Sequence, residues 1–179
     1  MIAISQQADQ SCVQVFFFRS GQHYGNRAYF PSHTKGLPPD IILEAFIGQF
    51  YESHSPPPVI LLSKNINNIQ LIESALSIQT KYKVSLNIPI KGKKKELILH
   101  AEVNALEALN RRMAESASQR KLLDELAIKL QLESPPERIE VYDNSHISGS
   151  SPVGGMIVVG SSGFLRNQYR KFNIKNNEI

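Results

Sequence analysis

The chain has 179 residues, a hydrophobic fraction of 41% and a formal net charge of +4 at pH 7. This apolar content excludes global disorder and predicts a folded core, in one large domain or two small lobes. The single cysteine, Cys12, excludes an intrachain disulfide, and no apolar run reaches the roughly 18 residues of a membrane helix. With no targeting segment at its beginning, we expect a cytoplasmic protein whose mild basicity favours a polyanionic partner.

Residues 1–92 predict an α/β lobe. Apolar, β-rich residues alternate with turn signals and with apolar residues at helical spacing. The expected order is strand, strand, helix, strand, helix, strand, over residues 13–18, 28–30, 40–53, 59–62, 69–76 and 84–88. The first two strands form a hairpin around a glycine-containing turn, and the proline triplet at 56–58 ends the first helix.

Residues 93–135 predict a helical connector. No glycine or proline lies between Gly92 and Pro135. Two leucine-rich stripes fit one very long helix, about 60 Å at 1.5 Å per residue. They also fit two helices that meet near the small residues at 116–118. Either arrangement ends at Pro135-Pro136, because the residue before a proline avoids the helical region.

Residues 136–179 predict an antiparallel meander of three strands, at 138–143, 156–159 and 169–174, joined by short glycine-containing turns. Such a meander leaves a sheet edge open, so an unstable or aggregation-prone fold is one alternative for this region.

The first of these strands ends at Asp143, which is followed by Asn144, Ser145 and His146. A carboxylate there can bind Mg²⁺ or Mn²⁺, whose preferred ligands are oxygens, and paired ions of this kind cleave phosphodiesters. His146 can contact phosphate or assist a metal-bound water. By themselves these residues are more typical of an Asx-type turn and a loop histidine. Glu140 is expected on the opposite strand face, since side chains alternate.

Basic residues next to aromatics are candidates for binding a phosphate backbone, with a salt-dependent affinity. They accompany Tyr169 and Phe172 in the last strand and flank the glycine turn of the first hairpin. A run of lysines between 81 and 95 is more typical of a solvated surface. The candidate DNA-binding residues are Arg19, Arg27, Arg166, Arg170 and Lys171.

Several stretches, spread in order along the whole chain, closely resemble the UvrC family of bacterial nucleotide excision repair. The most specific are YDNSHISG at 142–149 and NQYRKFNI at 167–174. Further similar stretches are CVQVFFFR at 12–19, GNRAYFP at 25–31, AFIGQFY at 45–51 and NALEAL at 104–109.

This resemblance implies a nuclease subunit that incises DNA on both sides of a lesion after UvrA and UvrB have found it. In the family, a GIY-YIG domain cuts on the 3′ side, and an RNase H-like domain with divalent metal cuts on the 5′ side. Residues 136–179 would be the first three strands of that RNase H-like domain. Asp143 would be its first catalytic aspartate and a metal ligand, and His146 the motif's histidine. Arg170 and Lys171 would face DNA.

The chain also departs from the family's pattern. Nothing in it resembles the GIY-YIG domain, the UvrB-binding helical hairpin or the helix-hairpin-helix pair. The second catalytic aspartate and a later histidine are expected beyond residue 179. We therefore expect an internal piece of UvrC that does not cut DNA efficiently by itself. The alternative is a non-catalytic module that binds DNA or a repair protein.

Overall fold

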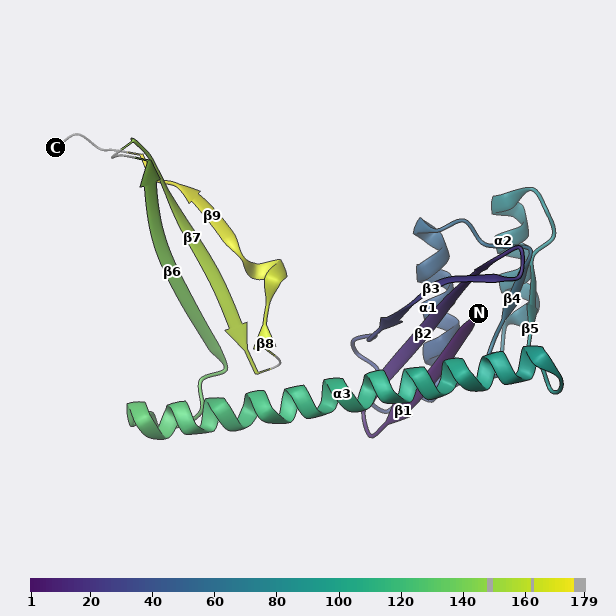
Figure 1. The fold of residues 1–179 in the computed structure, drawn as a ribbon, viewed down its shortest axis with the longest axis horizontal. Helices are drawn as coiled ribbons and strands as arrows, with labels where there is room; N and C mark the ends of the chain where they lie inside the picture. Colours follow the sequence, from purple (N-terminus) through teal and green to yellow (C-terminus); the bar gives the residue numbers. More distant parts are fainter. Residues whose placement is uncertain (148–149, 162, 176–179) are drawn as a thin grey trace. The chain divides into compact units, whose positions relative to one another are not determined.

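A computed structural model describes residues 1–147, 150–161 and 163–175 (Figure 1). The chain forms two compact units, Met1–Arg111 and Arg112–Ile179. Helix α3 (Lys93–Leu130) begins in the first unit and ends in the second. It is one continuous helix of 38 residues. The single long helix, rather than two helices meeting near Ser116, is therefore the arrangement adopted.

The first unit contains a sheet whose central strand was not predicted. Strands β1 (Ile2–Gln7), β2 (Gln10–Arg19) and β3 (Gln22–Tyr29) form an antiparallel meander. Strands β4 (Val59–Leu61) and β5 (Ser85–Asn87) pair in parallel. A parallel bridge between Ile2 and Leu62 joins the two groups, giving the order β3-β2-β1-β4-β5.

Helices cover both faces of this sheet, as Figure 1 shows. Helices α1 (Pro39–Ser53) and α2 (Ile69–Thr80) pack on one face through a core that includes Val13, Val15 and Leu43. The first part of α3 lies on the other face, where Ala3, Phe16 and Ala101 pack together. The odd and even residues of β2 serve different layers because strand side chains alternate between faces.

The ends of α1 follow from local chemistry. Pro39 occupies the first helical turn, where its missing N–H costs nothing. His54 is extended after the helix, and the prolines at 56–58 prevent continuation. The observed helix agrees with the predicted range of 40–53. Helix α2 ends at Lys81, whose left-handed backbone lets its N–H donate to the Ser77 carbonyl.

The second unit contains the expected meander. Strand β6 (Arg138–Ile147) pairs antiparallel with β7 (Ser150–Gly160). Strands β8 (Gly163–Phe164) and β9 (Arg170–Asn173) both pair antiparallel with β7, separated by the short 3-10 helix η1 (Arg166–Gln168). Val158 is buried, whereas Val141 and Phe172 remain nearly half exposed.

Candidate functional site

Asp143 and Lys171 share one row of the second sheet. Asp143 on β6 pairs with Gly155 on β7, and Gly155 pairs in turn with Lys171 on β9. Residues paired across neighbouring strands project from the same face, so the carboxylate and the ammonium group share a face. Two strand spacings of about 4.8 Å put their backbones roughly 10 Å apart.

Gly155 keeps the space between these two side chains open. A Cβ atom at this position would meet only the backbone oxygen of Asp143, at 3.9 Å. Both charged residues are exposed. An anion that reaches Lys171 on this face therefore lies beside the carboxylate of Asp143.

The opposite face of β6 holds a polar chain. The Arg138 guanidinium forms an ion pair with Glu140 at 2.6 Å and also donates to Gln168. The Tyr142 hydroxyl donates to the other Glu140 oxygen at 2.6 Å. That hydrogen bond, followed by the one from Arg138, lowers the pKa of Glu140, and the hydrogen bond to the Glu140 carboxylate raises the pKa of Tyr142. The expected orientation of Glu140, away from Asp143, is confirmed.

His146 on β6 lies opposite an irregularity in β7. The pairing with β7 shifts register between Ser145 and Ile147, which is typical of a β-bulge. The extra residue lies on β7, between Ser150 and Val153, so regular alternation along β6 places residues 143 and 146 on opposite faces. His146 is exposed. The next two residues of the motif, Ser148 and Gly149, lie outside the described part of the chain.

The neighbouring cations Arg170 and Lys171 lie on opposite faces of β9. Arg170 pairs with Met156, which pairs with Tyr142, so it belongs to the face of Glu140. Its guanidinium donates to the carbonyls of Asn167, at 3.2 Å, and Tyr169, at 2.8 Å. Arg166 begins η1 and is exposed. Of this adjacent pair, only Lys171 lies on the face of Asp143.

The two arginines of the first hairpin belong to the first unit. Arg19 ends β2, with its guanidinium carbon 5.6 Å from the centre of the Tyr24 ring. Arg27 on β3 lies 5.1 Å from the centre of the Tyr29 ring. Both contacts are cation–π interactions, which hold a guanidinium over an aromatic face.

Asp143 is the predicted metal ligand, and the described residues form no complete metal centre around it. Within residues 1–147, 150–161 and 163–175, no three His, Cys, Asp or Glu side chains converge as a metal-binding group would. Glu140 faces away from Asp143 and is held by Arg138 and Tyr142. The residues present therefore do not fit a resident two-metal site by themselves.

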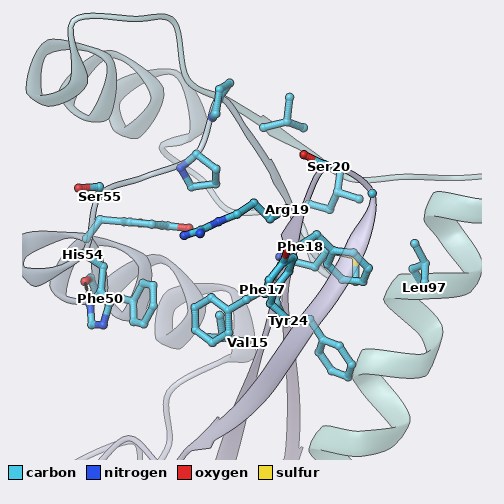
Figure 2. A pocket seen from close by; sticks show the side chains of 18 of the residues that line it. Val15, Phe17, Phe18, Arg19, Ser20, Tyr24, Phe50, His54, Ser55 and Leu97 are labelled. Atoms are coloured by element: carbon cyan, nitrogen blue, oxygen red, sulfur yellow. Dashed lines mark hydrogen bonds between the residues drawn. The ribbon is translucent and has the colours of Figure 1, made fainter.

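A pocket at the end of β2 was not predicted from the sequence. It has a volume of about 1190 Å³ and is lined by aromatic, basic and small residues (Figure 2). The signal in the sequence was Phe16-Phe17-Phe18-Arg19, which holds more aromatic surface than one strand face buries. No helix in the described part of the chain has both the length and the apolar character needed to cross a membrane.

Comparison with known proteins places both units in one family. A family model described as "UvrC Ribonuclease H-like domain" matches residues 1–112, and one described as "UvrC RNAse H endonuclease domain" matches residues 127–179. The RNase H-like description, expected only for residues 136–179, thus also applies to the first unit. Together the two matches take in most of both compact units.

Individual relatives match along the whole chain. The UvrABC system protein C of Rhodopseudomonas palustris strain CGA009 is 52% identical over 175 residues, which are 98% of this chain and 25% of that protein. Its counterpart in Nitrobacter hamburgensis is 52% identical over 179 residues, which are 100% of this chain and 26% of that protein. That of Brucella abortus is 51% identical over 179 residues, 29% of its length.

The chain thus spans about a quarter of the length of the curated relatives that it matches. The resemblance inferred from the motifs at 142–149 and 167–174 is confirmed by these matches. Two family models in chain order, and about half of all residues identical to relatives along its entire length, show that the chain belongs to the UvrC family.

Proposed function

We propose that this chain contributes to an excision nuclease that incises damaged DNA on the 5′ side of a lesion during nucleotide excision repair. The observation that carries this proposal is the row Asp143, Gly155, Lys171. It lies within the segment that resembles the endonuclease domain of UvrC. A cation and a carboxylate on one open face suit a phosphodiester that is held and cut at the same place.

In this proposal Lys171 attracts and positions the phosphate backbone, while Asp143 offers a hard oxygen ligand to Mg²⁺ or Mn²⁺. Such ions supply an activated water and stabilise the leaving oxygen when a full ligand set holds them. The described residues hold only one candidate ligand of that set, Asp143, so efficient cutting requires ligands beyond those the described residues supply. The chain by itself is then a poor nuclease.

The proposed partners follow from the same reasoning. The DNA is a damaged duplex, already bound by UvrB when the nuclease subunit arrives. Most of the contact with UvrB is made by segments that have no counterpart in this sequence. The proposed location is the bacterial cytoplasm, where DNA and the other repair subunits meet.

A second role, as a non-catalytic binding module, is favoured for the first unit. Its central strand β1 carries no Asp or Glu. Where β1 passes the end of β4, the Ile4 N–H donates to the Ser63 hydroxyl at 3.1 Å, and both residues are buried. These apolar and hydrogen-bonded groups hold the fold together, and β1 offers no carboxylate for a hard metal ion.

A hybrid protein tests the nuclease proposal. The corresponding quarter of the Nitrobacter hamburgensis relative is replaced by this chain, and incision of a lesion-bearing duplex is followed with UvrA, UvrB and Mg²⁺. We expect incision on both sides. Asp143→Asn should abolish the 5′ cut and spare the 3′ cut, whereas Glu140→Gln, on the opposite face of the same strand, should spare both.

Two results would contradict the proposal. One is a hybrid in which Asp143→Asn still cuts on the 5′ side at the original rate. The other is robust cutting by the isolated 179-residue chain that disappears in Asp143→Ala, since that would mean the chain holds a complete site. Circular dichroism of each variant shows whether the fold is retained.

A further inference from the structure

The pocket at the end of β2 lies entirely within the first unit. Its wall is formed by β2, the following turn with Tyr24 of β3, the end of α1 with the segment after it, β4 and the start of α3. Figure 2 shows Arg19 reaching from the end of β2 into the space before His54 and Ser55, with Leu97 on the far side. At about 1190 Å³ it exceeds the roughly 300–1,000 Å³ of typical small-molecule sites.

Three aromatic side chains of this pocket remain accessible. The pairing of β2 with β3 shifts register between Phe16 and Phe18, and at this point β2 changes from buried to exposed residues. Phe17 is 40% exposed, Phe18 37% and Tyr24 63%. Phe16, by contrast, is buried against α3. Exposed rings at a strand end provide flat surfaces on which other rings can stack.

The charges around the pocket have one sign. Arg19 and Lys94 line it, and none of the lining residues is an aspartate or glutamate. Arg19 is also the cation held over the Tyr24 ring. His54 stacks on Phe50 at 4.1 Å, and its Nδ1 lies 2.9 Å from the Phe50 carbonyl, which fixes that imidazole at the rim. The pocket therefore complements a ligand that is both aromatic and anionic.

We propose that this pocket binds a short single-stranded segment of DNA, with a base stacked on Tyr24 or Phe17 and the flanking phosphates at Arg19 and Lys94. Stacking on aromatics beside a basic groove is how proteins hold single strands without reading their sequence. Duplex DNA is a poorer ligand because its base faces are stacked inside the helix. An apolar peptide is also a poorer ligand because it carries no negative charge to pair with Arg19 and Lys94. The choice of DNA as the nucleic acid rests on the proposed function.

The test is titration of the full chain with a fluorescent oligothymidylate, followed by anisotropy. Tyr24→Ala should weaken binding by at least about fivefold, the low end for loss of one stacked base, while Tyr24→Phe retains the ring and binding. Arg19→Ala should weaken binding and reduce the salt slope by about 0.7, the value for one phosphate contact in a single strand. Arg111→Ala removes the same charge from an exposed position outside the pocket and is the matched control.

A strand of abasic sites separates stacking from simple charge attraction, and it should bind much more weakly than oligothymidylate. Equal affinity for the abasic strand, or equal losses in Arg19→Ala and Arg111→Ala, would overturn the proposal. So would a pocket that ignores oligothymidylate but binds purified UvrB in a Tyr24-dependent manner, which would make it a protein-docking site.

The same titration distinguishes this inference from the nuclease proposal. Oligothymidylate binding is tested at Tyr24, which lines the pocket, and incision is tested at Asp143, which lies outside it. If oligothymidylate binding depends on Tyr24 but Asp143→Asn does not change the 5′ cut of the hybrid, only the nuclease role is refuted. If incision depends on Asp143 but Tyr24→Ala does not change oligothymidylate binding, only the proposal that the pocket binds single-stranded DNA is refuted.

Discussion

Replacement of two adjacent cations should have unequal effects on the binding of duplex DNA. Lys171→Ala removes the cation that shares a face with Asp143, whereas Arg170→Ala removes one on the other face of β9. Arg170 is also engaged with the carbonyls of Asn167 and Tyr169. The two variants lose the same charge from neighbouring positions, so each is the control for the other.

The expected magnitude follows from counterion release. Each phosphate contact to duplex DNA contributes about 0.9 to the slope of log affinity against log salt. Raising the salt concentration fourfold, from about 50 to 200 mM, weakens DNA binding. This salt-dependent loss of affinity should be about 3.5-fold smaller in a variant that lacks one phosphate contact than in the unmodified chain. We expect this change in Lys171→Ala and an unchanged slope in Arg170→Ala.

The assay is fluorescence anisotropy of the whole chain with a labelled duplex, in EDTA, at several salt concentrations. Under these conditions Asp143 is a bare anion beside the phosphate, so Asp143→Asn should bind more tightly. A contact at about 4 Å in water corresponds to about 1 kcal/mol, or roughly fivefold. Equal slope changes in Lys171→Ala and Arg170→Ala would refute the assignment of DNA to the face of Asp143.

Three further predictions concern stability. Gly155→Ala should stabilise the second unit by about 0.5–1 kcal/mol in urea denaturation, because its Cβ meets only an ordinary contact. Gly154→Ala should gain less, since its Cβ would lie 3.0 Å from the Asn144 side-chain oxygen; the reverse order would contradict the register. Leu43→Ala, at a fully buried core position, should cost about 2–5 kcal/mol, and a loss below 1 kcal/mol would contradict its packing. Burial raises the pKa of the Tyr51 hydroxyl above that of the unfolded chain. The free energy of unfolding should therefore be unaffected by this group below about pH 10 and should decrease above it, by up to about 1.4 kcal/mol per pH unit. Urea melts of Tyr51→Phe at pH 8 and pH 11 should show a smaller fall, and an identical fall would exclude Tyr51 as its source.

The missed strand β1 shows where local pattern reading fails. Ile2, Ala3 and Ile4 are all buried, because β1 lies inside the sheet with helices on both faces. Such a strand lacks the alternation of apolar and polar residues that marks a half-exposed one.

The helical connector shows the opposite case. The absence of glycine and proline over residues 93–130 leaves nothing to break a helix, and serine and alanine at 116–118 are tolerated in a helix interior. From the sequence alone, two helices that meet near residues 116–118 remained an alternative, because helix propensity does not exclude a break there. The structure adopts a single helix.

The sequence by itself determined the family, the positions of most helices and strands, and Asp143 as the candidate catalytic carboxylate. These depend on short-range patterns and on motifs that can be read residue by residue. Only the tertiary structure decided that Lys171 shares the face of Asp143 while Arg170 does not, and that aromatic residues near the register shift between β2 and β3 line a pocket. Both depend on strand register. A shift of one residue reverses every face, and the pairing is fixed by contacts between residues distant in the chain.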